Sequence, residues 1–211
     1  VTTSRIIREM IFTKHPNRSP HKALPFIKPS YFLQPGTVPE ITWFGHSSYL
    51  IQTGGKRILV DPVFCMASPV SFVNKPFKGT ELYTPDDMPD IDYLVISHDH
   101  WDHLDYNTVK KLKDRIGAVI CPLGVGEHFE YWGFDKERLI ELDWNEDANL
   151  APGFMIHCLP ARHFSGRRLT ANQSLWASFL LEAPSQKIYI GGDGGYDTHY
   201  AEIGNRFPGI D

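Results

Sequence analysis

The stretch Leu94–Tyr106, LVISHDHWDHLDY, places three histidines and three aspartates directly behind a short apolar run. Residues 91–97, IDYLVIS, combine apolar and β-branched side chains and therefore predict a short buried strand. His98 and His100 alternate at the end of that strand, so both side chains should leave it on the same side. Asp102 and His103 follow after one spacer, where we expect the chain to turn.

This density of imidazoles and carboxylates is typical of a metal site. Such ligands suit zinc, and also iron or manganese, better than calcium or magnesium, which take mostly oxygen. Four candidate ligands within six residues are hard to aim at one tetrahedral ion, and they divide more naturally between two neighbouring ions. Two adjacent ions can clamp an ester or phosphoryl oxygen. The alternative, a polar loop with helix-capping aspartates, would suit a lone histidine better than this pattern.

Two later places in the chain supply further candidate ligands. His163 follows a strand-like run in CLPARHFSGR, and Asp193 lies among four glycines in YIGGDGGY. Glycines on both sides let the backbone turn sharply and bring a carboxylate close to an ion. Taken alone, His163 would be interpreted as a surface or core histidine and Asp193 as a turn residue, and each gains weight because a two-ion site needs more ligands.

The composition indicates one globular domain of 211 residues, with 42% hydrophobic and 22% charged residues. The net charge of −4 gives no basic footprint, so no nucleic-acid partner is expected. No apolar run is long enough to span a membrane. Three cysteines without a close pair favour a reducing compartment, and hence the cytoplasm, over a disulfide scaffold.

The pattern along the chain is rich in strands and poor in helices. Residues 1–38 are rich in proline and basic residues and read as an extended N-terminal arm. The pattern predicts a hairpin that turns at Gly54–Gly55 and a long loop over residues 67–89. Asn107 is expected to cap a helix that Gly117 ends. The remaining predicted strands are 118–123, 138–144, 154–161, 174–183 and 187–193, with a short helix near 126–133. We therefore expect an α+β fold with a mixed or mostly antiparallel sheet covered by helices on its outer faces.

The motifs SHDHWDHLD, LPARHFSGR and GGDGGY, in this order and spacing, resemble those of the metallo-β-lactamase fold. ITWFGHSSYLIQTGGKRILVDPVF is similar to the opening hairpins and the aspartate turn of that family. CPLGVGEHFEYWGF, IELDWNE and RRLTANQSLWASFLLE resemble the branch that contains N-acyl-phosphatidylethanolamine-hydrolysing phospholipase D and its bacterial relatives. The resemblance covers about residues 36–211 and implies an αββα sandwich over residues 39–211 with metal ions at one edge.

The resemblance also implies how the ligands divide. His98, His100 and His163 match the ligands of one ion, and Asp102, His103 and a bridging Asp193 match those of the other. The family completes the second ion with a later histidine, and His199 follows Asp193 too closely to match it. We therefore expect a C-terminally incomplete domain that lacks the last ligand of the second ion. One apolar face of this chain should be exposed unless a missing segment or a second copy covers it.

The resemblance implies a metal-dependent hydrolase that uses a metal-bound hydroxide, with zinc as the expected ion and manganese or iron as alternatives. Asp102 would bind metal and also act as the catalytic residue that handles the proton. A phosphodiester, above all a lipid phosphodiester, is the expected substrate of this phospholipase D-like phosphodiesterase, which would be cytoplasmic or membrane-peripheral. The alternatives are a lactone or cyclic phosphodiester, or a catalytically incomplete metal-binding scaffold.

Other polar residues have more than one reading. His46, in FGHSSYL, either supports the ligands, meets the substrate or is structural. Arg162, Arg167 and Arg168 could meet an anionic substrate, but a solvated charge cluster is the favoured interpretation.

Overall fold

The computed structural model describes Arg5, Arg8, Phe12, Thr13 and residues 19–28, 38–65, 68, 76–167 and 170–211. Most of the predicted N-terminal arm, much of the predicted loop at 67–89 and Arg168 lie outside these residues. The boundary predicted near residue 38 therefore stays a prediction. None of the described helices is long and apolar enough to cross a membrane.

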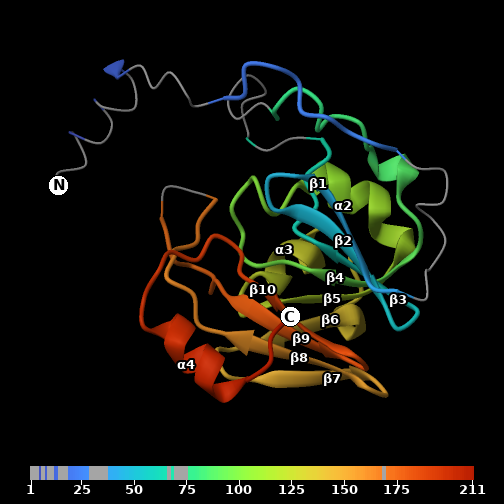
Figure 1. The fold of residues 1–211 in the computed structure, drawn as a ribbon, viewed down its shortest axis with the longest axis vertical. Helices are drawn as coiled ribbons and strands as arrows, with labels where there is room; N and C mark the ends of the chain where they lie inside the picture. Colours follow the sequence, from blue (N-terminus) through green and yellow to red (C-terminus); the bar gives the residue numbers. More distant parts are fainter. Residues whose placement is uncertain are drawn as a thin grey trace.

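The described chain forms two β-sheets that face each other (Figure 1). The first sheet has the order β1-β2-β3-β4-β5-β6, and its strands are Glu40–Gly45, Ser48–Thr53, Lys56–Val60, Ile91–Val95, Ile116–Pro122 and Leu139–Leu142. The second sheet has the order β10-β9-β8-β7, and the strands β7 to β10 are Asp147–Ala151, Phe154–Leu159, Ser178–Ala183 and Gln186–Ile190. The helices are α2 Tyr106–Leu112, α3 Gly126–Tyr131 and α4 His199–Arg206, with short 3-10 turns at Pro85–Asp87, Lys113–Arg115 and Lys136–Arg138.

Alternation along the strands builds three separate apolar layers. Successive residues of a strand point to opposite faces, so Leu94 enters the core under α2 and α3 while Val95 enters the core between the sheets. In β9, Phe179 and Leu181 also face the first sheet, whereas Leu180 faces α4. The result is a helix–sheet–sheet–helix sandwich, which confirms the expected α+β fold.

Helix α4 covers the outer face of the second sheet through Ile203 and Phe207, which pack on Leu159 and Leu180. The sequence pattern did not predict α4. Among the described sheet residues, the large exposed apolar side chains are instead Ile41 and Trp43 of β1 and Leu123 beside β5. Leu159 and Leu180 are buried, and the incomplete domain with an uncovered apolar face stays a prediction from the sequence.

The hairpin prediction is confirmed, because β2 and β3 pair in an antiparallel manner through Gly54 and Gly55, both with positive φ. The mixed sheet is also confirmed, since β1 to β3 are antiparallel and β3 to β6 are parallel.

The predicted ends of the first helix were wrong. Asp105, and not Asn107, caps α2, because its carboxylate accepts a hydrogen bond from the backbone N–H of Asn107 at 3.0 Å. Gly117 does not end the helix and lies instead in β5. A Cβ at Gly117 would lie 2.6 Å from the carbonyl oxygen of Asp92, so this glycine permits the close approach of β4.

Candidate metal centre

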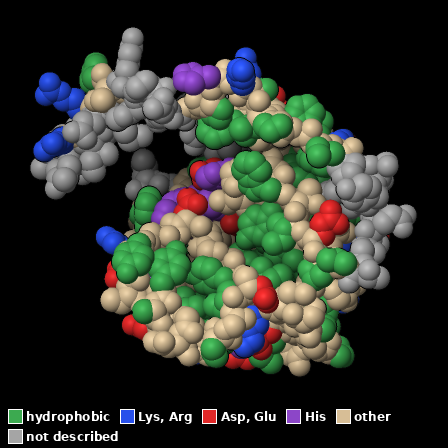
Figure 2. Space-filling model, viewed as in Figure 1, with side chains coloured by type: hydrophobic (Ala, Val, Ile, Leu, Met, Phe, Trp, Pro, Cys, Tyr) green, Lys and Arg blue, Asp and Glu red, His purple; other side chains and the backbone are tan. Residues whose placement is uncertain are grey.

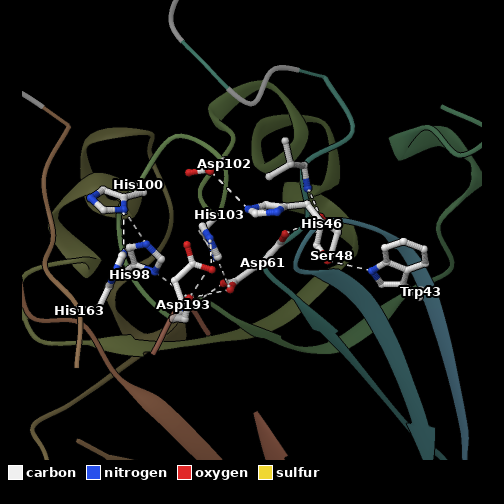
Figure 3. A network of polar contacts seen from close by, with 12 residues as sticks. Trp43, His46, Ser48, Asp61, His98, His100, Asp102, His103, His163 and Asp193 are labelled. Carbon is white, nitrogen blue, oxygen red and sulfur yellow. Dashed lines mark hydrogen bonds and ion pairs between the residues drawn. The ribbon is translucent and has the colours of Figure 1, made fainter. Parts of the chain in front are cut away.

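Strand direction explains why distant residues meet at one edge of the sandwich. Strands β3 and β4 are parallel, so Asp61 and His98 follow them at the same edge. Strands β8 and β10 each pair antiparallel with β9 and therefore run in the same direction as each other. That brings His163, after β8, and Asp193, after β10, to a common edge. Figure 3 shows these side chains pointing toward one another.

The first group of candidate ligands is the three histidines that the sequence assigned to one ion. His100 Nδ1 lies 2.8 Å from His98 Nε2 and 3.2 Å from His163 Nε2. Burial lowers the pKa of all three imidazoles, and for His98 to about 2, with the neighbouring His103 and His100 adding to the effect. Neutral imidazoles present free lone pairs, so this group fits a divalent transition metal ion.

The second set of candidate ligands lies directly beside the first. His103 Nε2 is 3.2 Å from Asp193 Oδ1, an ion-pair contact that leaves this buried nitrogen without a hydrogen bond. His46 Nε2 is 3.3 Å from Asp102 Oδ2. Two overlapping groups result, His46 with Asp102 and His103, and His98 with His103 and Asp193, each with ligand atoms within 4.8 Å. A buried nitrogen without a hydrogen bond beside two carboxylates fits a second cation.

All six residues expected as ligands therefore lie close together, and their division between two ions stays a prediction. Asp102 faces His46, from the turn between β1 and β2. The contact with His46 and the charge of His103 lower the pKa of Asp102, although burial alone would raise it. His199 does not join any group, since it lies buried at the start of α4.

Asp61 has a part in the site that its place in the sequence did not reveal. Its fully buried carboxylate accepts hydrogen bonds from Ser97 N at 2.8 Å, Ser97 Oγ at 2.6 Å and His103 Nδ1 at 2.8 Å. Burial alone would lower the pKa of His103, but the carboxylates of Asp61 and Asp193 raise it to about 10. The available signal was the sequence VDPV at the end of a predicted strand. That signal is weak, because aspartate is also common in ordinary turns.

Local backbone geometry holds several of these residues in place. His46 and Asp61 have φ of 46° and 40°, which side chains other than glycine rarely adopt and which is frequent at functional sites. Gly192 has φ of 54°, and a Cβ there would lie 2.9 Å from Ser97 Cβ. The predicted role of glycine beside Asp193 is thus confirmed at Gly192.

Polar and hydrophobic side chains both surround the site. Figure 2 shows histidine and acidic side chains together in a hollow, with hydrophobic side chains near it. Trp43 Nε1 donates a hydrogen bond to the carbonyl of His46 at 2.8 Å, and Trp43 also lines a cavity of about 140 Å³. The other described residues around that cavity are mostly apolar: Leu24, Pro25, Phe26, Ile27, Phe44, Gly79, Thr80, Leu82 and Tyr83.

A family model described as the beta-lactamase superfamily domain matches residues 56–211. The chain belongs to this superfamily. Among curated members of related sequence, an uncharacterized protein of Mycobacterium tuberculosis is 38% identical over 205 residues, which cover 95% of this chain and 54% of that protein. N-acyl-phosphatidylethanolamine-hydrolyzing phospholipase D 1 of Caenorhabditis elegans is 31% identical over 185 residues, covering 81% of this chain and 51% of that protein. The chain spans about half the length of these curated relatives.

Solved structures confirm the metallo-β-lactamase fold of this superfamily member. Igni18, a metallo hydrolase from the archaeon Ignicoccus hospitalis, superposes with a TM-score of 0.59 at 19% identity, covering 81% of this chain and 67% of that one. CmlA, a diiron beta-hydroxylase from Streptomyces venezuelae, gives 0.61 at 22% identity, covering 82% and 33%. At these identities the likeness concerns the fold.

Proposed function

We propose that the protein is a metal-dependent hydrolase and that its substrate is a phosphodiester that carries an apolar group, such as a lipid phosphodiester. The observation that carries this proposal is the meeting of three neutral histidines with a second, carboxylate-containing group at one edge of the sandwich. His98, His100 and His163 would hold one ion, and Asp102, His103 and Asp193 the other. Zinc suits these ligands, and manganese or iron are the alternatives.

When bound, such ions polarise a phosphoryl oxygen and lower the pKa of water to about 7. The chain itself would then handle the proton. Asp102 would orient the attacking water, accept its proton and pass a proton to the leaving oxygen. His46, at 3.3 Å, would fix the orientation of that carboxylate. Asp61 would hold His103 in the ring orientation that directs Nε2 into the site.

Two observations support the apolar substrate. The cavity beside Trp43, whose Nε1 donates to the carbonyl of His46, is lined mainly by apolar side chains, and its volume of about 140 Å³ is similar to cavities that hold benzene. In addition, the named relative from Caenorhabditis elegans hydrolyses an N-acyl phospholipid. A cytoplasmic or membrane-peripheral location remains a prediction from the sequence.

The proposal is tested by hydrolysis of bis(p-nitrophenyl) phosphate, an N-acyl phospholipid and a lactone, each with and without a chelator and with zinc, manganese or iron added. We expect metal-dependent cleavage of both phosphodiesters, whereas turnover of the lactone alone would favour the lactonase alternative. Metal binding without turnover of any substrate would favour a binding scaffold.

Two substitutions test the roles of individual residues. His98→Ala should abolish hydrolysis and reduce metal content, and Asp102→Ala should lower kcat by about 10²- to 10⁴-fold, with circular dichroism unchanged. His21→Ala, which removes an exposed histidine outside the site, is the matched control and should leave turnover intact. Turnover at the wild-type rate in either site variant would contradict the assignment.

A further inference from the structure

The sequence favoured a solvated charge cluster for Arg167, and the structure contradicts this interpretation. Arg167 is partly buried, and its Nη1 donates hydrogen bonds to the backbone carbonyls of Asp99, at 3.0 Å, and Leu104. Its guanidinium lies 3.9 Å from the centre of the Trp101 ring. Burial lowers the pKa of Arg167 to about 10, so the group still carries its charge at neutral pH.

These contacts span the loop that carries His98, His100 and His103. Asp99 and Leu104 lie near the two ends of that loop, so one guanidinium binds both ends while Trp101 supports it from within. Within the loop, the backbone N–H of Leu104 donates to the carbonyl of His100 at 2.8 Å. Arg167 therefore closes a turn that carries most of the candidate ligands.

Asp99 makes the reciprocal contact. Its buried carboxylate accepts a hydrogen bond from the backbone N–H of Gly166 at 2.7 Å, and its other oxygen lies 3.5 Å from His128 Nε2. Each loop thus gives a side chain to the backbone of the other: Arg167 binds the carbonyl of Asp99, and Asp99 binds the N–H of Gly166. We call this pair of contacts the Asp99–Arg167 clasp.

We propose that the Asp99–Arg167 clasp sets the position of His163 relative to His98 and His100, so that Arg167 is a positioning residue for the three-histidine group. His163 is only four residues before Arg167, and its loop has no other described side-chain hydrogen bond to the backbone of the loop 98–104. The inference rests on the proposed function in one respect, namely that the three histidines bind a metal ion. Groups that orient metal ligands change metal affinity by about 10- to 100-fold when removed.

The sign of the effect separates this role from a simple charge effect. A cation near a metal site opposes the binding of a second cation, so removal of the Arg167 charge alone should strengthen metal binding. Loss of the clasp should weaken it. Arg167→Met and Arg167→Lys should therefore both bind Co²⁺ or Zn²⁺ about 10- to 100-fold more weakly. Lysine keeps the charge but lacks the planar guanidinium that lies over the Trp101 ring while its Nη1 donates to both carbonyls.

Arg138→Met is a matched control. Arg138 also donates to backbone carbonyls, those of Gly117, Lys113 and Ile116, and lies over the ring of Phe134, but it contacts none of the candidate ligands. Its loss should lower the thermal stability of the metal-free protein to an extent comparable with loss of Arg167. Arg138→Met should leave metal affinity unchanged. If Arg167 had only a structural role, the Arg167 variants would also leave metal affinity unchanged.

The experiment is calorimetric titration of the metal-free protein with Zn²⁺, together with the visible spectrum of the Co²⁺ form, without any substrate. Weaker binding in both Arg167 variants and unchanged binding in Arg138→Met supports the clasp. Equal or tighter binding in Arg167→Met, or an equal loss in Arg138→Met, overturns it. If Arg167→Met does not fold, Arg167→Lys and Asp99→Ala decide, and wild-type affinity in these two overturns the inference. A wild-type protein that binds no metal at all would overturn the proposed function, and the clasp with it.

Discussion

The substitution Asp61→Asn tests whether one buried carboxylate organises the metal centre. It keeps the size of the side chain but removes its charge and replaces one acceptor oxygen by an N–H donor. Oδ1 can still accept from Ser97 N, whereas Oδ2 accepts from both Ser97 Oγ and His103 Nδ1. The new amide would therefore point its N–H groups at two groups that also donate.

The structure sets the size of the effect. Asp61 and His103 are both fully buried, and removal of one partner of a buried pair costs about 3–5 kcal/mol. We expect Asp61→Asn to lower the free energy of unfolding of the metal-free protein by about 3 kcal/mol. For a chain of this length, that corresponds to a decrease in Tm of about 6–12 °C. Metal affinity should also fall by about 10- to 100-fold, because the His103 ring loses the acceptor that orients it.

The pH dependence gives an independent check. His103 has a folded-state pKa of about 10, above its ordinary value of 6.5, with burial opposing the rise and Asp61 the main cause of it. Its contribution to stability is therefore fully present below pH 6.5 and is lost as the pH rises toward 10. The difference between wild type and Asp61→Asn should be largest near pH 6 and should shrink toward pH 10.

The assay is urea denaturation of both chelator-treated proteins at pH 6, 8 and 10. Asp92→Asn is the control, because Asp92 pairs with Lys56 at the partly exposed end of the same sheet and should contribute at most about 1 kcal/mol. A difference below about 1 kcal/mol at pH 6 for Asp61→Asn, or one that does not depend on pH, would refute the reasoning.

Three further predictions follow from the same structure. A saturating metal at about 1,000 times its Kd should raise the free energy of unfolding by about 4 kcal/mol, and a chelator should remove this gain in a thermal melt. Leu24→Trp should fill the cavity beside Trp43. It should reduce kcat/KM for long-chain alkyl p-nitrophenyl phosphates but not for the methyl ester, and Ala23→Trp is the control. An equal loss for both esters would argue against an apolar subsite. Gly192→Ala should cost about 1–3 kcal/mol by denaturation and weaken metal binding, since its φ is positive and the new Cβ would meet Ser97; a variant as stable as the wild type would contradict this geometry.

Much of the fold was predictable because local patterns carry it. The hairpin at Gly54–Gly55 needs positive φ at both residues, and glycine supplies it at no steric cost. Strand β7 was missed because its sequence, DANLA, contains Asp, Asn and Ala, which are poor strand formers. It forms because it pairs with β8, and this pairing is a tertiary contact that its own sequence does not show. The helix α4 was missed because its apolar face becomes evident only against Leu159 and Leu180.

The sequence by itself determined the kind of chemistry, because HxHxDH behind a strand concentrates metal-binding groups within one turn of chain. It also indicated His163 and Asp193, through the resemblance and the need for further ligands. Tertiary structure alone decided the partners of these residues: Asp61 binds His103, Asp102 faces His46, and Arg167 joins two loops that are more than 60 residues apart. The physical reason is that a side chain's charge and hydrogen bonds depend on which groups the packed sheets bring within about 3 Å, and spacing along the chain does not contain that distance.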